Sequence, residues 1–367
     1  MKRIRNILIC PLEWGLGHAG RMIPLAAKLR EAGNNIFIGA GNEIMSFFLH
    51  ELPGLTYIDF PGFRPGYSKF LPQYLILLLK TPVLLFHIFR EHSRLKKIIH
   101  EYGIDIVISD NRFGLWNKKV RTVYVTHMPL IPFPRCFSFL EFIGIVLHRA
   151  VINRYSLCFI PDLPGELNLT GRLSHGIRLP QNTRYIGILS RFTGMVTSNA
   201  GGHSGHDHYT IILSGPEPQR EILKQKLTAV MDASRIETVV LEGKPGKPSE
   251  TSVKDSIRFF SHLVSNEMRE VITGSRGVVA RAGYTSIMEL ISLNCCALLI
   301  PTPGQTEQEY LAGYLSGKGW FAVVPQNRIN TDMIIPPVAP VWPAEIISRS
   351  RILLDEALAE LSEDHQE

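Results

Sequence analysis

Short, almost wholly apolar runs alternate with longer helical patterns twice along this chain, and this alternation constrains the fold most. In the first half, the runs 6–10, 35–41, 104–110 and 123–127 are rich in β-branched residues, and 22–33 is a helical pattern closed by a glycine. Continuously apolar strands that alternate with helices are typical of a parallel sheet covered on both faces. The pattern therefore predicts a doubly wound α/β domain.

The same alternation restarts after a change in composition. Residues 192–208 contain almost no large apolar side chains and are rich in Gly, Ser and His, as expected of a flexible linker. A chain of 367 residues is long enough for two domains. We therefore predict four regions: an N-terminal Rossmann-like domain at 1–191, the linker at 192–208, a second Rossmann-like domain at 209–342, and a C-terminal helix and tail at 343–367.

Composition narrows the classes of partner and compartment. With 39 Lys and Arg against 33 Asp and Glu, the formal net charge is +6, which favours an anionic partner. No dense basic stripe is present, so a nucleic-acid partner is not expected. The five cysteines form no C-x-x-C pair, and an odd number argues against a disulfide framework, so we expect reduced thiols in a cytoplasmic protein. The linker contains side chains of the kinds that bind metals, namely His203, His206, Asp207 and His208. A metal site needs ligands that the structure holds in place, so no metal site is expected in a flexible linker.

Two apolar segments raise the question of a membrane. Residues 71–89 approach spanning length, but Lys80 and Pro82 stand in the middle, and a lysine inside a bilayer is costly. Residues 137–155 are apolar with scattered cations. Both segments fit peripheral attachment to an anionic membrane surface. Plain packing into the core is an equally open alternative.

The stretch EWGLGHAGR at 13–21 contains Gly15, Gly17 and Gly20 in the order G-x-G-x-x-G. In a dinucleotide-binding domain these glycines follow the strand directly, and an acidic residue ends the second strand. Here PLEW separates the strand from Gly15, and no acid follows the second strand until Glu43. An NAD-dependent oxidoreductase is therefore disfavoured. We expect the glycines to let the backbone turn tightly and approach another ligand.

Two longer stretches carry a family resemblance: residues 14–38 around this glycine motif, and residues 280–315, ARAGYTSIMELISLNCCALLIPTPGQTEQEYLAGYL. They resemble family 28-type glycosyltransferases, whose best-known member adds N-acetylglucosamine to the peptidoglycan lipid intermediate. GLGHAGR and SDNRFG are most similar to a less characterised branch. The resemblance implies the GT-B architecture, in which two Rossmann-like domains face each other across a cleft and a C-terminal helix returns to the first domain. It also implies an inverting reaction, a nucleotide-diphosphate sugar that is usually UDP-linked, no bound metal, and attachment to the inner face of the cell membrane.

The segment RAGYTSIMEL is the strongest candidate for the donor site. A strand ends near Arg281, Gly283 makes the turn, and a helix is predicted to begin at Thr285 or Ser286. The free N–H groups of a helix N-terminus bind diphosphate well, and by the resemblance Glu289 accepts hydrogen bonds from the ribose. Ser286-x-x-Glu289 is also the spacing of a capping box, which any helix can use.

Further donor residues follow from the resemblance, each beside a structural alternative. Glu307 and Gln308 match positions that hold the sugar hydroxyls, but Thr306-x-x-Glu309 is again a capping-box spacing. By the resemblance, His262 and Leu263 at a strand end contact the nucleotide base, but a lone histidine at a strand end is otherwise structural. Ser214 and Gly215, after the first strand of the second domain, would contact phosphate. The alternative is that they only begin a stable helix. The remaining donor-side candidates are Gly15, Gly17, Tyr284 and Gln305.

The first domain should supply the acceptor site and the general base. Ligands of open parallel sheets lie beyond the carboxyl ends of the strands, where His18, Asp110 and His127 stand. Glycosyl transfer needs a group that deprotonates the acceptor hydroxyl. By the resemblance His18 is the first choice. Asp110 is the second choice or orients His18, Arg112 binds a lipid-linked phosphate or pairs with Asp110, and His127 is an acceptor-side or a structural residue.

The sequence thus predicts a metal-independent, inverting glycosyltransferase that takes a sugar from a UDP-linked donor to a lipid-linked or envelope-glycan acceptor. Two alternatives remain. Nucleotide-sugar epimerases share the architecture, but they need no acceptor and would lack apolar membrane-facing helices. A membrane-docked subunit that binds nucleotide sugar without catalysis is the other, and the presence of His18, Asp110 and Glu289 argues against it.

Overall fold

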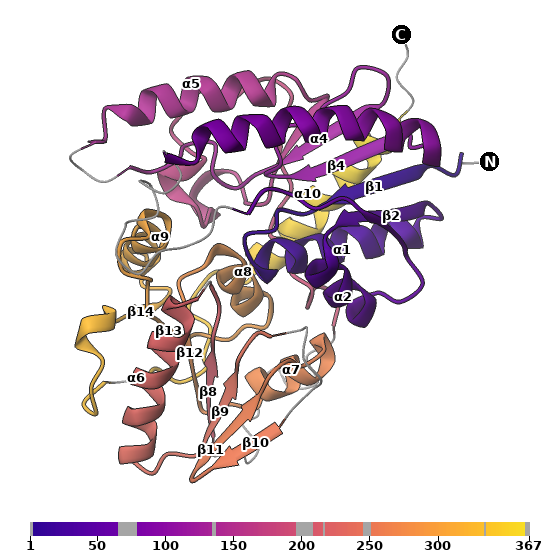
Figure 1. The fold of residues 1–367 in the computed structure, drawn as a ribbon. Coiled ribbons are helices and arrows are strands. Elements are labelled where there is room, and N and C mark those ends of the chain that lie inside the picture. The colour runs from indigo at the N-terminus through magenta and orange to yellow at the C-terminus, as the bar shows by residue number, and fades with distance from the viewer. Residues whose placement is uncertain are drawn as a thin grey trace.

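The computed structural model describes residues 3–64, 79–133, 137–195, 208–215, 217–244, 251–333 and 335–363. They form two α/β domains that stand one above the other in Figure 1. Each domain is built on a seven-stranded sheet with helices packed against it. The predicted pair of doubly wound domains is confirmed.

The N-terminal sheet has the strand order β3-β2-β1-β4-β5-β6-β7, and every pairing in it is parallel. The order reverses between β1 and β4, where Cys10 pairs with Ser109. Open α/β sheets bind their ligands at such a switch point, beyond the carboxyl ends of the strands. The strands are β1 (Asn6–Cys10), β2 (Asn35–Ala40), β3 (Thr56–Asp59), β4 (Ile106–Asp110), β5 (Arg121–Val125), β6 (Leu157–Ile160) and β7 (Thr183–Tyr185).

The C-terminal sheet has the order β10-β11-β9-β8-β12-β13-β14, and only its edge strand β10 runs antiparallel to its neighbour. Its switch point lies between β8 and β12, which places the loops after these two strands on the same edge. The strands are β8 (Tyr209–Ile212), β9 (Thr238–Leu241), β10 (Thr251–Lys254), β11 (Ile257–Phe260), β12 (Gly277–Ala280), β13 (Leu298–Leu299) and β14 (Ala322–Val323).

Helices connect the strands in both domains. The N-terminal domain contains α1 (Leu16–Glu31), α2 (Asn42–Glu51), α4 (Thr81–Tyr102) and α5 (Leu140–Ile152), with the short 3-10 helices η2 (Gly165–Leu167) and η3 (Gly171–Leu173). The C-terminal domain contains α6 (Gln219–Ala233), α7 (Ser265–Thr273), α8 (Tyr284–Ser292), α9 (Thr306–Gly317) and the 3-10 helix η4 (Gln326–Arg328).

The last helix, α10 (Glu345–Ser362), joins the two domains (Figure 1). Its first turn packs in the C-terminal core through Ile346, whereas Leu354, Ala357 and Leu361 belong to the core of the N-terminal domain. At the crossing, a side chain on Gly187 would overlap the backbone of Ser350. The chain therefore returns to the first domain with a helix that stabilises both cores.

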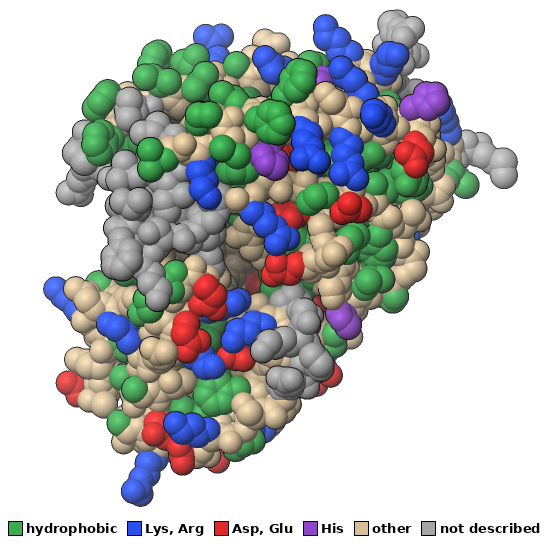
Figure 2. Space-filling view, viewed as in Figure 1, with side chains coloured by type: hydrophobic (Ala, Val, Ile, Leu, Met, Phe, Trp, Pro, Cys, Tyr) green, Lys and Arg blue, Asp and Glu red, His purple; other side chains and the backbone are tan. Residues whose placement is uncertain are grey.

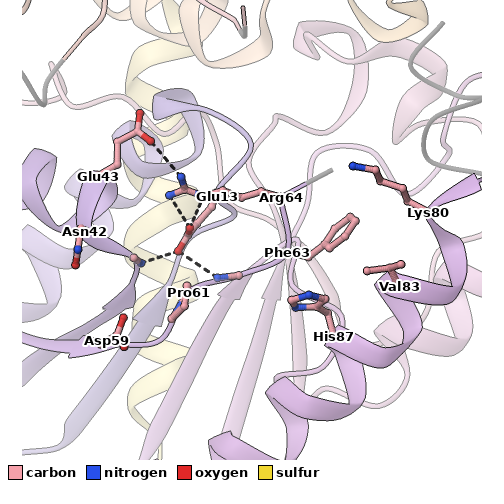
Figure 3. Close-up of a pocket in the computed structure, with 12 residues that line it drawn as sticks. Glu13, Asn42, Glu43, Asp59, Pro61, Phe63, Arg64, Lys80, Val83 and His87 are labelled. Carbon is pink, nitrogen blue, oxygen red and sulfur yellow. Dashed lines mark hydrogen bonds and ion pairs between the residues drawn. The ribbon is translucent and has the colours of Figure 1, made fainter. Parts of the chain in front are cut away.

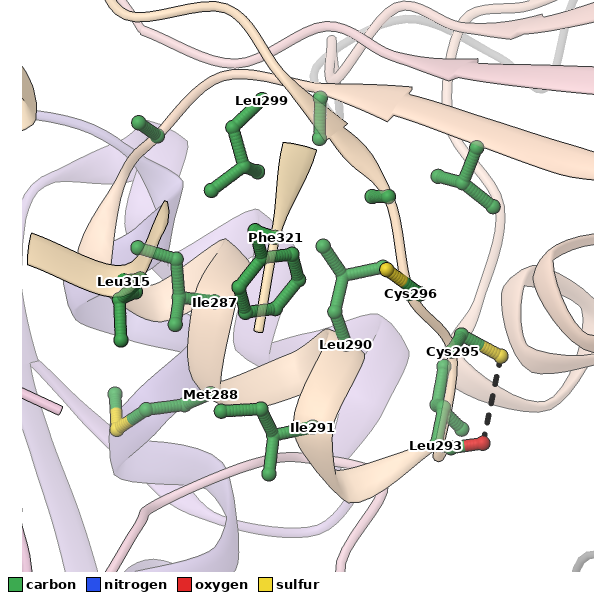
Figure 4. Close-up of a cluster of buried hydrophobic side chains, with 14 of the residues drawn as sticks. Ile287, Met288, Leu290, Ile291, Leu293, Cys295, Cys296, Leu299, Leu315 and Phe321 are labelled. Atoms are coloured by element: carbon green, nitrogen blue, oxygen red, sulfur yellow. Dashed lines mark hydrogen bonds between the residues drawn. The ribbon is translucent and has the colours of Figure 1, made fainter. Parts of the chain in front are cut away.

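Helix α8 is fixed by its apolar face. Ile287, Met288, Leu290 and Ile291 are almost fully buried and pack around Phe321 and neighbouring strand residues (Figure 4). Burial of several large apolar side chains on one short helix stabilises it strongly, by roughly 1.5–3 kcal/mol for each side chain. The N-terminus of α8 is thereby held rigidly at the edge that faces the first domain.

The predicted linker at 192–208 and the two apolar segments can be compared with the structure over their described residues. Phe192 and His208, at the ends of the predicted linker, are buried, and His203, His206 and Asp207 lie outside the described residues. Among the residues that the structure describes, no helix is long and apolar enough to cross a membrane. Instead α4 and α5 carry many exposed apolar side chains, visible as green groups on the upper domain in Figure 2.

Candidate active site

The switch point of the N-terminal sheet brings His18 and Asp110 together. Gly15 has φ +151° and ends the loop after β1, so α1 begins at Leu16 and places His18 in its first turn. Asp110 is the last residue of β4, the strand next to β1. His18 Nδ1 lies 2.9 Å from Asp110 Oδ2. When Nδ1 donates to this carboxylate, Asp110 orients the imidazole and leaves its other nitrogen as a base.

Arg21 completes this cluster, although the sequence did not single it out. It stands one turn after His18, is 1% exposed, and donates through Nε to Asp110 Oδ2 at 3.0 Å. Its Nη2 atom contacts Asp110 Oδ1 and also lies 2.8 Å from His18 Nδ1. The i, i+3 spacing of a histidine and an arginine after the glycines was the available signal.

The charges of the cluster set its protonation. Burial would raise the pKa of Asp110, but Arg21 and His18 outweigh burial and lower the pKa, so the carboxyl stays ionised. Burial lowers the pKa of His18, and Arg21 lowers it further against the opposing effect of Asp110. The imidazole is therefore held in the neutral form that a general base requires.

His127 links the cluster to the other domain. Its Nδ1 atom lies 3.0 Å from Arg21 Nη1, and its Nε2 atom lies 2.9 Å from Glu307 Oε1 in the first turn of α9. The ring stacks on Tyr284 of α8, with centroids 4.3 Å apart. Burial would raise the pKa of Glu307, but His127, together with His18 and Arg21, lowers the pKa, so the carboxylate is ionised. The structure thus brings His127 into the site.

The N-terminus of α8 lies against the glycine loop. The helix begins at Tyr284 with Gly283 as its N-cap and no side-chain cap, so the predicted alternative of a Ser286–Glu289 capping box is wrong. The hydroxyl of Thr285 donates to the Gly17 carbonyl at 3.0 Å. A Cβ on Gly17 would lie 3.1 Å from Thr285 Oγ1, so a glycine suits this close approach of the two domains.

Glu289 faces the domain boundary. It is 8% exposed and accepts a hydrogen bond from Arg191 Nε at 2.8 Å, and Arg191 also pairs with Glu51 of α2 at 3.3 Å. Burial raises the pKa of Glu289 despite the nearby guanidinium. The sequence did not identify Arg191, because only the fold brings it beside a residue 98 positions away.

The start of α9 also differs from a capping box. Its N-cap is Gln305, and the Thr306 hydroxyl donates to the Pro132 carbonyl of the first domain at 2.9 Å. Gln308 is 5% exposed, and its Oε1 accepts from the Thr302 N–H at 2.9 Å. Of the two predicted sugar contacts, Glu307 therefore faces the other domain, whereas Gln308 fixes its own loop.

Arg281 was predicted on the donor side, but its guanidinium has a structural role. It is fully buried and donates to the carbonyls of Gln219, Ile300 and Pro301. Arginine satisfies several carbonyls at once because its donors form a fixed fork. The side chain therefore holds loops of the C-terminal domain together.

The other donor-side candidates lie at the expected sheet edge. Ser214 and Gly215 follow β8, and Gly215 has φ +90°, a conformation that favours glycine. His262 and Leu263 follow β11. The His262 ring lies 5.8 Å from that of Phe47 in the first domain. His262 therefore lies near the same boundary as Glu289.

Arg112 does not pair with Asp110. The carboxylate of Glu91 lies 2.9 Å from Arg112 Nη2, and the guanidinium donates to the carbonyls of Gly39 and Phe60. At 2% exposure Arg112 has no surface for a lipid-linked phosphate. Its role is to join α4 to the sheet, which corrects both interpretations made from the sequence.

A pocket of about 850 Å³ opens beside β1, β2 and β3 (Figure 3). Glu13 stands at its base, where the carboxylate accepts the N–H groups of Gly41 and Gly62 and pairs with Arg64. Sequence analysis missed this residue, although it stands directly before the glycine motif. The remaining lining residues come from α2, the end of β3, the loop after β3, and α4 with its N-cap: Asn42, Glu43, Asp59, Pro61, Phe63, Lys80, Val83 and His87.

Known proteins match both the sequence and the fold. Residues 224–340 match the profile of the glycosyltransferase family 28 C-terminal domain. An uncharacterized glycosyltransferase of Methanosarcina acetivorans is 23% identical over 86% of this chain and 84% of that protein. A UDP-N-acetylglucosamine–N-acetylmuramyl-(pentapeptide) pyrophosphoryl-undecaprenol N-acetylglucosamine transferase of Bacillus thuringiensis is 31% identical over 26% of this chain and 27% of its own length. The glycosyltransferase SnogD of Streptomyces nogalater has the same GT-B fold, with a TM-score of 0.61, 14% identity, and coverage of 98% of this chain and 100% of that one.

Proposed function

We propose that this chain, which is a glycosyltransferase of the family 28 type, moves a sugar from a UDP-linked donor such as UDP-N-acetylglucosamine to the hydroxyl of a lipid-linked or envelope-glycan acceptor. The observation that carries the proposal is the His18–Asp110 pair, which stands across the domain boundary from Thr285 and Glu307. A base on one domain and donor-binding groups on the other are the parts that group transfer needs.

His18 is the base in this proposal. In this proposal Nδ1 carries the ring proton and donates it to Asp110, rather than accepting from Arg21 Nη2, so the Nε2 atom is left to take the proton of the acceptor hydroxyl. The acceptor oxygen then bonds to the anomeric carbon, and the bond from that carbon to the diphosphate breaks with its electron pair on the leaving oxygen. Attack from the face opposite the leaving group inverts the configuration.

The donor is held by the C-terminal domain. The first-turn N–H groups of α8 have no side-chain cap, and they stabilise the leaving diphosphate in the absence of a metal ion. Glu289 accepts hydrogen bonds from the ribose, and Glu307 accepts one from the sugar. The similarity to a transferase that uses UDP-N-acetylglucosamine supports this choice of donor.

The acceptor enters from the N-terminal domain. The pocket around Glu13 is lined by Lys80, Val83 and His87 of the α4 region, and α4 continues into the exposed apolar surface that it shares with α5. A polar head group in the pocket and a lipid tail along this surface would suit a lipid-linked substrate at a cytoplasmic membrane face.

Calorimetric titration with UDP, UDP-N-acetylglucosamine, other nucleotide sugars and NAD tests the donor assignment. Glu289→Gln keeps the shape of the side chain and an acceptor for Arg191, but it removes the charge that the ribose hydroxyls would meet. We expect wild-type protein to bind a UDP compound and the variant to bind it about 10- to 100-fold more weakly, as for a lost charge-assisted hydrogen bond.

Glu267→Gln is the matched control, because Glu267 is exposed in the first turn of α7. It should leave every affinity unchanged. Tight binding of NAD, or equal affinities in wild-type and Glu289→Gln protein, would contradict the donor site.

A further inference from the structure

A chain of buried polar side chains connects the proposed base to the donor-binding domain. Asp110 accepts two hydrogen bonds from Arg21, Arg21 contacts His127, and His127 contacts Glu307. The first three residues are at most 4% exposed. The contacts run from β4 through α1 and the loop after β5 to the first turn of α9.

The donors and acceptors in this chain fix the position of one proton. A guanidinium can only donate, so His127 Nδ1 accepts from Arg21 Nη1 at 3.0 Å and carries no proton. The proton of the ring is then on Nε2, which donates to Glu307 Oε1 at 2.9 Å. Arg21 therefore selects the tautomer of His127 that can hold Glu307.

The surroundings fix the orientation of His127 and Glu307. The His127 ring is within 6° of parallel to the ring of Tyr284, whose hydroxyl donates to the Pro161 carbonyl. Within the described residues, His127 is the one hydrogen-bond partner of the Glu307 carboxylate, and its contact uses Oε1. The second oxygen, Oε2, is left for a ligand.

We propose that Arg21 and His127 are positioning residues that orient Glu307 toward a hydroxyl of the donor sugar when the two domains meet. Groups that hold a ligand-binding side chain through its other atom determine its precision. Asp110 then anchors both sides of the reaction, because it orients His18 directly and Glu307 through the Arg21–His127 relay. This inference rests on the proposed function, since it assumes a nucleotide-sugar donor.

Titration of His127→Phe with UDP and with UDP-N-acetylglucosamine separates positioning from structural support. Phenylalanine keeps the stack on Tyr284 but can neither accept from Arg21 nor donate to Glu307. We expect the affinity for UDP to stay within about twofold, and that for UDP-N-acetylglucosamine to fall about 10-fold, because only the sugar loses its aligned partner. His127→Gln, whose amide both accepts and donates, should restore most of the loss.

Glu309→Gln is the matched control, because Glu309 lies in the same turn and caps Gly304 within its own domain. It should leave the ratio of the two affinities unchanged. Equal weakening of both ligands by His127→Phe would assign His127 to domain packing alone and overturn the proposal. So would unchanged affinities, or a His127→Gln variant as weak as His127→Phe.

Failure of the wild-type chain to bind either uridine ligand would be a different result, because it would contradict the proposed donor and the relay with it. Thermal unfolding of each variant, compared with wild-type protein, checks that the affinities are measured on folded protein.

Discussion

At the scale of single residues, the site depends on how one carboxylate is shared. Asp110 faces both Arg21 and His18, so the same negative charge satisfies a buried guanidinium and supports the imidazole. A buried carboxylate usually forms one ion pair with a single cation, whereas Asp110 contacts two side chains at once. Its two partners keep Asp110 ionised, whereas burial, helped by Arg21, keeps His18 neutral against the opposing effect of Asp110.

Replacement of Asp110 by Asn should therefore change both the rate and its pH dependence. The pKa of His18 is lowered by burial, so the neutral base persists below the usual histidine range and activity is lost only as the pH falls through that lowered pKa. Asp110 raises the pKa of His18, so Asp110→Asn should move the acid limb to still lower pH. Loss of the oriented carboxylate should also lower the rate about 10²- to 10⁴-fold.

The rate of UDP release from UDP-N-acetylglucosamine, measured from acid to neutral pH, tests this expectation. Asp332→Asn is the control, since Asp332 is exposed in the C-terminal domain. An acid limb that stays in place in Asp110→Asn would show that the residue titrating there is not His18.

The sequence predicted the residues of the site that follow a strand or a motif, and it missed those that only the fold brings near. His18, Asp110 and Glu307 stand at the ends of strands or helices, and both the sequence pattern and the family resemblance identify such ends as ligand-binding positions. Arg21 and Arg191 find partners 89 to 106 and 98 to 140 positions away, and no local pattern encodes such distances. The capping-box alternatives fail for the same reason, because Glu289 and Thr306 bind across the domain boundary instead.

At the scale of elements, strand and helix order was predictable because apolar runs and glycine stops alternate regularly. The ends of elements were less predictable: the segment IRFFSHL at 257–263 has the pattern of one strand, but it forms a strand only over Ile257–Phe260. Tertiary contacts decide such ends, since a strand stops where its neighbour offers no further partner.

The crossing of α10 over the N-terminal domain gives a stability prediction. Gly187 and Gly176 both have φ +71°, but a Cβ on Gly187 would lie 2.3 Å from Ser350 Cα, whereas one on Gly176 would meet nothing within 4 Å. Gly176→Ala should lower the free energy of unfolding by about 1–2 kcal/mol through backbone strain. Gly187→Ala should lower it by about 2–5 kcal/mol, because overlap with the helix backbone adds to that strain.

Urea denaturation of both variants measures the difference directly, with Gly176→Ala as the internal reference for strain. Equal losses of stability would mean that α10 can move away from Gly187 without cost, and that its crossing is not a fixed contact.

At the scale of the whole molecule, the two domains meet through the site itself. Thr285 donates to the Gly17 carbonyl, Glu307 binds His127, and Arg191 bridges Glu51 and Glu289. If the donor diphosphate binds the N-terminus of α8 as proposed, it lies against the contact between Thr285 and Gly17. Composition could predict two domains, but it contains no information about how closely they meet.

The outer surface of the N-terminal domain gives the last prediction. On α4 and α5 several large apolar side chains are half or more exposed, and green groups cover this part of the upper domain in Figure 2. Among them are Phe89 and Phe142, at 72% each. Arg90 and Lys97 on α4 are exposed near them. Such a surface suits the boundary of an anionic membrane, where each phenylalanine that leaves water contributes up to about 1.5–3 kcal/mol and each cation about 1 kcal/mol.

Sedimentation with phosphatidylcholine vesicles, with and without about a third of phosphatidylglycerol, tests this surface. We expect wild-type protein to bind the anionic vesicles more tightly, and Phe89→Ser/Phe142→Ser to bind them about 10- to 100-fold more weakly, because two large apolar groups no longer enter the lipid. Val253→Ser/Val341→Ser removes apolar groups that are 67% and 57% exposed on the C-terminal domain, and it should bind as wild-type protein does. Both double variants should keep wild-type affinity for UDP, since neither pair lies at the domain boundary. If the two variants bound vesicles alike, the apolar surface of α4 and α5 would not be the lipid-facing side, and the acceptor would have to reach the pocket around Glu13 from water.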